Sequence, residues 1–341
     1  MPHPPLKLAA VQAAPVFMDG PATVDKACAL IAQAAEAGAD LVLFPEAFVP
    51  GYPLWVWFVP PGDTATLRQG YTRLVRNSVT IPGPLTERLG EASRECGVTV
   101  AIPVSELATE GSGTTVYNTI LYFGPDGRIL GKHRKLVPTV GERMLWGQGD
   151  GSTLEVFDTP VGRLGGLVCW ENYMPLARYA MYAQGVQIYL APTWDRGEPW
   201  VSTMRHIAKE GRVIVVSACS AMRREHIPED LDFKERYLPA DMEWINPGMS
   251  CMVDPDGKFL VEPVEHRETI LYCDVDPDTL LGPRFQLDVA GHYARPDVFD
   301  LTIDRRAHPL TRSLTTAQMT VNGGDADPII ESLAVSTETV Q

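Results

Sequence analysis

Short apolar segments that alternate with amphipathic ones constrain this sequence more than any other feature. Residues 7–13 form an apolar run of strand length, and residues 23–37 place Ala, Leu and Ile at helical spacing before a stop at Gly38. Residues 40–44 form a second apolar run. Because strand, helix and strand at this spacing form a βαβ unit, we predict a layered α/β fold.

The same alternation continues along the chain. Further helices are predicted at residues 64–76, 84–96, 175–184 and 199–210, and further strands at 98–103, 154–157, 162–168, 187–191 and 213–218. Two hairpins, at residues 122–130 and 252–260, share a Pro-Asp-Gly turn between apolar runs. The repeated turn indicates either two related halves of one sheet pair or a common turn used twice.

Charge and composition disfavour several classes of partner. The 341 residues carry a formal net charge of −14, which disfavours a nucleic acid or an anionic membrane. No run approaches the roughly 18 apolar residues of a membrane span. Six scattered cysteines without a CxxC pair indicate reduced thiols, and seven dispersed histidines form no HxxxH or HExxH pair. We therefore predict a cytoplasmic protein that binds no metal, nucleic acid or membrane.

One cysteine stands where enzymes built on sheets place their sites. The predicted strand 162–168 runs directly into Cys169, and a helix is predicted soon after. Backbone N–H groups at such a turn can lower a thiol pKa and stabilise developing negative charge. A cysteine after an apolar strand is also a common small buried hydrophobe. Cys169 is therefore a candidate nucleophile, and a thiol nucleophile needs a base.

Two charged residues follow other strands in the same way. Glu46 comes after the strand 40–44, and Lys135 closes a basic strand end after the first hairpin. Each of them also fits the ordinary role of a solvated surface charge. Together with Cys169 they form a coherent set: the carboxylate accepts the thiol proton, the sulfur attacks an electrophilic carbon, and the amine stabilises charge on nitrogen. We predict a hydrolase of carbon–nitrogen bonds.

Over roughly residues 6–300 the sequence resembles the nitrilase superfamily. The matching segments are Phe-Pro-Glu-Ala-Phe around Glu46, His-Arg-Lys-Leu-Val-Pro-Thr around Lys135, and Cys-Trp-Glu-Asn from Cys169, the last in a form typical of the nitrilase branch. Glu142 matches a second glutamate that family members use to position substrate and lysine. His292 lies in Gly-His-Tyr-Ala-Arg-Pro-Asp, a segment that is also typical of this branch.

The resemblance implies an αββα four-layer sandwich and a catalytic triad. A nitrile and two waters would give a carboxylic acid and ammonia through a thioimidate and a thioester on Cys169. Glu46 would be the general base, while Lys135 and the backbone N–H of Trp170 would face the polar atom of each tetrahedral intermediate. No cofactor is implied. Nitrilase-branch proteins generally form homodimers or larger homo-oligomers, which often extend into spirals.

The loops leave more alternatives open. Tyr52, Trp57 and Trp194 either line a pocket for an apolar nitrile or only pack, and His292 is expected to hold structure near the site. We expect a hydrolase domain over residues 1–303 and a partly disordered extension over residues 304–341.

The substrate is open as well. A cyanide-degrading enzyme or an amidase would use the same triad, and a non-catalytic scaffold would keep the fold alone.

Overall fold

Two β-sheets form the centre of the molecule, which is represented by a computed structural model that describes residues 5–309. The first compact unit of the chain ends at Arg306. Its first sheet has the strand order β13 (Thr269–Val275), β1 (Leu6–Gln12), β2 (Leu41–Leu43), β3 (Thr99–Leu107), β4 (Val116–Phe123) and β5 (Ile129–Arg134). The second has the order β10 (Ala221–Arg223), β11 (Trp244–Val253), β9 (Ile214–Cys219), β8 (Ile188–Thr193), β7 (Gly162–Gly166) and β6 (Phe157–Thr159), and β12 (Phe259–Glu265) also pairs with β11.

Parallel pairing is confined to the middle of each sheet. The strands β1, β2 and β3 are parallel to one another, as are β7, β8 and β9, and the outer strands add antiparallel pairs. Carboxyl ends of parallel neighbours lie at the same edge of a sheet. This arrangement therefore provides one such edge in each sheet.

Successive side chains of a central strand face different layers, because side chains alternate across a sheet. Leu8 and Ala10 of β1 belong to a core cluster that includes Leu164 and Leu190 of the second sheet. Ala9 and Val11 instead belong to a cluster with helix residues of the opposite layer. The apolar runs of the sequence thus bury both faces of the sheet.

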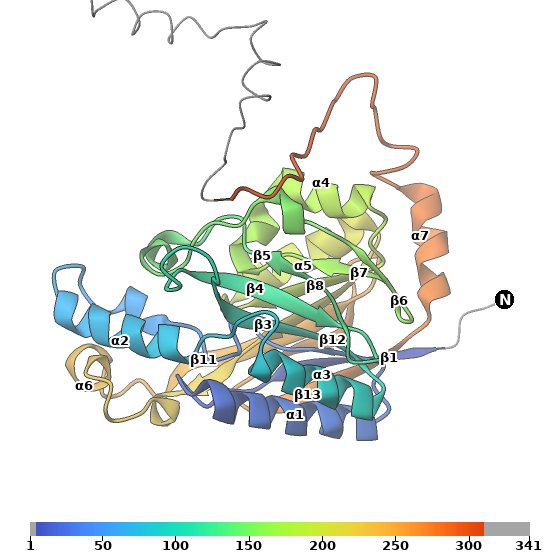
Figure 1. Ribbon diagram of the computed structural model, residues 1–341. Coiled ribbons are helices and arrows are strands. Elements are labelled where there is room, and N and C mark those ends of the chain that lie inside the picture. Colours follow the sequence, from blue (N-terminus) through green and yellow to red (C-terminus); the bar gives the residue numbers. More distant parts are fainter. Residues whose placement is uncertain (1–4, 310–341) are drawn as a thin grey trace, which may run out of the picture. The chain divides into compact units, whose positions relative to one another are not determined.

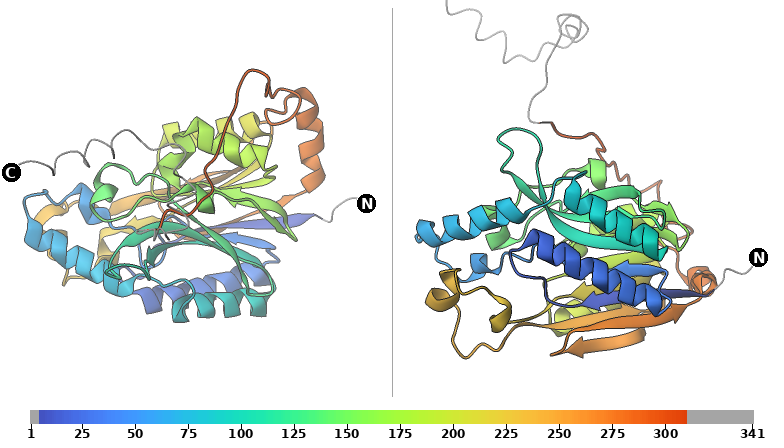
Figure 2. Two further views of the ribbon diagram at one scale, coloured as in Figure 1. Left: turned by 45° about the horizontal axis from the view of Figure 1, so that its top comes forward. Right: turned by 60° about the horizontal axis from the view of Figure 1, so that its bottom comes forward.

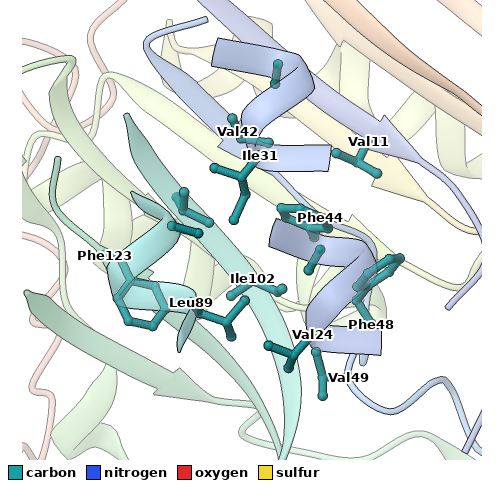
Figure 3. Packing of buried hydrophobic residues seen from close by; sticks show 14 of the residues in the cluster. Val11, Val24, Ile31, Val42, Phe44, Phe48, Val49, Leu89, Ile102 and Phe123 are labelled. Atoms are coloured by element: carbon teal, nitrogen blue, oxygen red, sulfur yellow. The ribbon is translucent and has the colours of Figure 1, made fainter. Parts of the chain in front are cut away.

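Helices cover the outer face of each sheet (Figure 1). The helices α1 (Gly20–Glu36) and α3 (Pro84–Cys96) lie side by side on the first sheet, as Figure 2 also shows. Val24 and Ile31 of α1 and Leu89 of α3 pack there against strand residues (Figure 3). The helices α4 (Pro175–Ala183) and α5 (Glu198–Gly211) pack on the second sheet. This is the αββα sandwich that the resemblance implied, and the fold class is confirmed.

Most of the predicted helices and strands are confirmed, with shifts of a few residues at their ends. The two Pro-Asp-Gly hairpins join β4 to β5 and β11 to β12, one in each sheet. The strand predicted at 154–157 is wrong: a 3₁₀ turn occupies Gly151–Thr153, and β6 begins only at Phe157. Leu154 is buried against helix residues of α4 and α5, so this apolar residue serves packing rather than strand pairing.

Further elements flank the sandwich. They are α2 (Thr64–Asn77), α6 (Phe233–Tyr237) and α7 (Leu281–Gln286). None of the helices described over residues 5–309 is long and apolar enough to cross a membrane, and the cytoplasmic location stays a prediction. All six cysteines are free thiols. The predicted boundary after residue 303 also stays a prediction, and residues 310–341 of the expected extension lie outside the described residues.

Candidate active site

The three predicted catalytic residues each follow a strand, and the fold brings them together. Glu46 comes after β2, Lys135 directly after β5, and Cys169 after β7 at the start of a 3₁₀ turn, Cys169–Tyr173. Segments of both sheets contribute, since Glu46 and Lys135 come from the first sheet and Cys169 from the second. The backbone N–H of Trp194, just after β8, donates to Oε2 of Glu46 at 2.7 Å and so joins the two sheets at this edge.

A buried lysine lies between two buried carboxylates. The Nζ of Lys135 is 2.9 Å from Oε1 of Glu46 and 2.7 Å from Oε2 of Glu142. All three side chains are at most 1% exposed. Asn118 donates a further hydrogen bond from Nδ2 to Glu46 at 2.8 Å, which fixes the orientation of this carboxylate. The structure thus places Glu142 in direct contact with the predicted lysine.

Charge within this cluster is unevenly compensated, because one amine serves two carboxylates. Burial raises the pKa of Glu46; Lys135 opposes this effect and the negative charge of Glu142 adds to it. Burial disfavours the charged form of Lys135, but the two carboxylates outweigh it and raise the lysine pKa. Glu46 is therefore a carboxylate with an increased tendency to take up a proton beside an amine that stays charged.

The backbone around the cysteine is held in an unusual conformation. Cys169 has φ +52°, in the left-handed region that residues other than glycine rarely adopt. Ala47, next to Glu46, has φ +49°, and Val140, two residues before Glu142, has φ +40°. Asn172 donates from Nδ2 to the carbonyls of Leu167 and Cys169, both at 2.9 Å, and braces the turn. Strained residues at three points of one site are typical of a preorganised functional centre.

The surroundings of Cys169 favour the protonated form of its thiol. Burial raises its pKa, the negative charge of Glu46 raises it further, and the positive charge of Lys135 opposes these effects. The thiol also accepts a hydrogen bond from Oγ1 of Thr193 at 3.3 Å. A protonated thiol beside a carboxylate of raised pKa is the pairing that general-base activation requires.

A cavity of about 230 Å³ opens onto the thiol, and aromatic rings form much of its wall. Tyr52 and Trp194 stack with their ring centroids 4.6 Å apart and an interplanar angle of 4°. The residues that line the cavity include Cys169, Glu142, Tyr52, Trp57, Trp170 and Trp194, together with Met242 and Ile245. The structure therefore brings the predicted pocket aromatics to one cavity, while their contribution to substrate selection stays a prediction.

Hydrogen bonds connect the aromatic wall to the charged cluster. The Nε1 of Trp57 donates to the hydroxyl of Tyr52 at 2.9 Å, and this hydroxyl donates to Oε1 of Glu142 at 2.7 Å. Burial and the neighbouring carboxylates, Glu142 first, raise the pKa of Tyr52 well above its ordinary value. The phenol is thus fixed as a neutral donor.

Among the predicted substrate-binding residues, which are Tyr52, Trp57, Trp170, Trp194 and His292, His292 is the one that does not line this cavity. It is exposed, its ring lies edge-on to Tyr293 with centroids 5.4 Å apart, and it is not part of the cavity lining. Within residues 5–309 no group of three or more His, Cys, Asp or Glu side chains is arranged to hold a metal ion.

Sequence reasoning missed a third buried carboxylate of this region, Glu171. Its Oε1 accepts from the backbone N–H of Leu136 at 2.6 Å, and its Oε2 accepts from the backbone N–H of Val168 at 2.8 Å. The Nε2 of His133 lies 3.1 Å from Oε2. Glu171 thus ties the residue after Lys135 to the residue before Cys169. A charged residue in an otherwise apolar segment, two positions after the candidate nucleophile, was the available signal.

Two polar neighbours of the catalytic groups were also missed, Asn118 and Thr193. Both lie within strands, β4 and β8, where the sequence pattern shows burial but not the partner of a polar side chain. Their partners, Glu46 and Cys169, are far away along the chain. Each contact joins segments of a single sheet, and only the order of the strands in that sheet reveals it.

Comparison with known proteins identifies one family for this chain. Residues 7–281 match the family model of the carbon–nitrogen hydrolases. The chain is 45% identical over 305 residues to an aliphatic nitrilase of Sinorhizobium fredii (87% of this chain, 95% of the relative) and 41% identical over 313 residues to nitrilase 1 of Arabidopsis thaliana (90% and 89%). Among solved structures, an amidase from Nesterenkonia sp. matches with a TM-score of 0.60 and 22% identity, covering 84% of this chain and 95% of that one.

Proposed function

Because this chain belongs to the carbon–nitrogen hydrolase family, and so is a hydrolase of carbon–nitrogen bonds other than peptide bonds, we propose that it hydrolyses a small organic nitrile to a carboxylic acid and ammonia. The observation that carries the proposal is a buried thiol beside a carboxylate–lysine–carboxylate cluster at an aromatic cavity. Proteins named nitrilases share 41–45% of their residues with it, whereas the amidase likeness at 22% identity concerns the fold.

The first half of the proposed reaction forms a covalent thioimidate. Glu46 accepts the proton of the Cys169 thiol as the sulfur attacks the nitrile carbon, one C–N π bond becomes a nitrogen lone pair, and Glu46 passes the proton on to this nitrogen. Lys135 and the backbone N–H of Trp170 supply positive charge and a donor to the nitrogen. A water deprotonated by Glu46 then adds to the carbon. Glu46 passes this proton, and then the proton of the new hydroxyl group, to the nitrogen, so that ammonia leaves, a thioester remains and Glu46 is again a carboxylate.

The second half releases the acid. A second water, again deprotonated by Glu46, attacks the thioester carbonyl, the C–S bond breaks, and Cys169 recovers its proton. One nitrile and two waters thus give one acid and one ammonia without a cofactor. The raised pKa of Glu46 suits these repeated proton transfers, and Glu142, bonded to Lys135 and Tyr52, holds the amine in position.

The test is product analysis with a panel of nitriles, amides and cyanide. Ammonia, acid and amide are quantified for the unmodified enzyme, for Cys169→Ala and for Cys251→Ala, a buried cysteine of β11 in a core cluster packed by α4 and α5. We expect acid and ammonia from a nitrile, lost in the first variant and kept in the second. Activity on amides or cyanide alone would move the assignment to those substrates, and turnover by Cys169→Ala would refute the mechanism.

We also propose that the chain assembles into a homodimer or a larger, spiral homo-oligomer. Support comes from large apolar side chains that are exposed beside α4, where a groove lies between this helix and the segment after residue 288. Leu176, Tyr293 and Phe299 are 68%, 62% and 75% exposed. Light scattering after size exclusion should give a mass of two or more chains, and a monomer at working concentration would refute the proposal.

A further inference from the structure

The short segment that follows β8 contacts several parts of the proposed active site at once. The hydroxyl of Thr193 reaches Sγ of Cys169, and the backbone N–H of Trp194 donates to Glu46. The carboxylate of Asp195 accepts from Nε1 of Trp170 at 2.8 Å. Most of these contacts fix orientation, but the one made by Thr193 ends on the reacting atom itself.

The direction of the Thr193 hydroxyl is set by its second partner. A hydroxyl has one proton and two lone pairs. The backbone N–H of Asp195 donates to Oγ1 of Thr193 at 2.8 Å and occupies one lone pair. The single hydroxyl proton is then available for the sulfur of Cys169, 3.3 Å away. Because Thr193 is fully buried, water does not compete for this proton.

We propose that Thr193 is an additional catalytic residue, whose hydroxyl is held as a hydrogen-bond donor to Sγ of Cys169 and stabilises negative charge on the sulfur. The inference rests on the proposed function, in which Cys169 is the nucleophile. Charge develops on the sulfur twice, when Glu46 removes the thiol proton and when the C–S bond of the thioester breaks. Thr193 keeps its own proton in both steps. The same hydrogen bond lowers the thiol pKa and so opposes the effect of burial.

A purely structural role makes a different prediction from a catalytic one. A buried hydroxyl that only satisfies the N–H of Asp195 affects stability, because its loss leaves a donor unpaired. A hydroxyl that stabilises a thiolate also affects the reactivity of the sulfur. Hydrogen bonds to charged groups are stronger than those between neutral groups, and their loss corresponds to a change of about 10- to 100-fold in rate.

The experiment compares three variants at position 193 with a control elsewhere. Thr193→Val keeps the shape and removes the hydroxyl, Thr193→Ser keeps the hydroxyl, and Thr193→Ala removes it but leaves room for a water that pairs the N–H of Asp195. The control is Thr23→Val, which removes a fully buried hydroxyl that donates to the carbonyl of Val16 at 2.8 Å at the start of α1.

The readouts are kcat, KM and the rate at which iodoacetamide alkylates Cys169 across pH, followed by peptide mass spectrometry. In Thr193→Val we expect kcat and the alkylation rate of Cys169 to fall about 10- to 100-fold, with the alkylation profile moved to higher pH and little change in KM. Thr193→Ser should recover most of both losses. If the valine variant does not fold, Thr193→Ala takes its place and should show the same shift of the alkylation profile to higher pH. The control Thr23→Val should change neither kcat nor the alkylation rate of Cys169.

Two outcomes would overturn the inference. One is an alkylation profile and a kcat in Thr193→Val, or in Thr193→Ala, that equal those of the unmodified enzyme while only the unfolding midpoint falls. The other is an equal loss in Thr193→Ser and Thr193→Val. Failure of the proposed function looks different. Activity of the unmodified enzyme on amides or cyanide alone would replace the substrate, and turnover by Cys169→Ala would remove the nucleophile, and neither result depends on the variants at position 193.

Discussion

Two buried carboxylates lie near the same thiol, Glu46 after β2 and Glu171 in the 3₁₀ turn that begins at Cys169, yet their environments drive their proton affinities in opposite directions. Glu46 shares one lysine with Glu142, and its pKa is raised, with burial as the largest cause. Glu171 has His133 and two backbone N–H groups to itself, and these partners outweigh burial and lower its pKa. The cluster of Glu46, Lys135 and Glu142 thus has two carboxylates for one ammonium group, whereas Glu171 is matched by the imidazole of His133.

The difference separates a group that exchanges protons from one that holds the site together. A carboxylate whose charge is incompletely compensated takes up a proton readily, which suits a general base. A carboxylate whose hydrogen-bonding capacity is filled stays ionised and fixes its partners. Glu171 accordingly joins the backbone next to Lys135 to the backbone next to Cys169. Burial does not distinguish the two roles, and neither does the number of donors, which is three for each carboxylate. The balance of charge does, because Glu46 shares the ammonium group of Lys135 with Glu142.

The largest expected effect is on turnover in Glu46→Gln. Glutamine keeps the size of the side chain but cannot accept the thiol proton, so kcat should fall by about 10²- to 10⁴-fold. The measurement is kcat on the best nitrile, with circular dichroism to establish folding. If the variant folds and retains more than a tenth of kcat, Glu46 is not the general base, and the proposed difference in role between Glu46 and Glu171 is wrong.

The second prediction concerns stability in Glu171→Gln. Removing this charge leaves His133 buried without its counter-ion, and breaking a buried pair from one side costs about 3–5 kcal/mol of unfolding free energy. Denaturant unfolding measures the loss. The control is Glu210→Gln, which alters a less buried carboxylate paired with Arg178 and should cost less. If Glu171→Gln is as stable as the unmodified enzyme, the contacts of Glu171 with His133 and with the backbone do not hold this part of the molecule together.

These two glutamates also show how far sequence reasoning extends. Strand-end position and family resemblance were enough to select Glu46, Lys135 and Cys169, since a strand end can be recognised from local hydrophobicity. Glu171 received no role, because its function depends on the N–H of Leu136 and on His133, which arrive from the other sheet. The wrong strand at 154–157 has the same origin: its apolar residues indicate burial, and burial does not specify strand pairing.

The third prediction separates the two carboxylates by pH. Because the folded pKa of Glu46 is raised, kcat/KM should fall as the pH decreases through a value above the ordinary glutamate range. Glu171 has a lowered folded pKa, so it contributes stability above its unfolded pKa, and this contribution is lost only as the pH decreases further, through the folded value. On acidification, activity should therefore be lost before this part of the stability.

His133 predicts the behaviour on the alkaline side. Burial alone would lower its pKa, but Glu171 outweighs burial and raises it, so its contribution is complete below the unfolded pKa and is lost as the pH increases through the folded pKa. Parallel profiles of kcat/KM and of the unfolding midpoint test both statements. Simultaneous loss of activity and stability on acidification would contradict the separation of roles.

The smallest predicted effect concerns the hydrogen bonds that connect the cavity wall to Glu142 and Lys135. Trp57→Phe keeps an aromatic ring in the cavity wall but removes the N–H that donates to Tyr52, and Tyr52 in turn donates to Glu142. Trp57 is 44% exposed, so water can replace part of the lost bond. A net loss of about 0.5–1.5 kcal/mol predicts a 2- to 10-fold fall in kcat/KM, without a change in the unfolding midpoint. An unchanged kcat/KM would mean that the orientation of Tyr52 does not depend on this bond. Buried contacts alone would then orient Glu46, Lys135 and Glu142, as they orient Glu171.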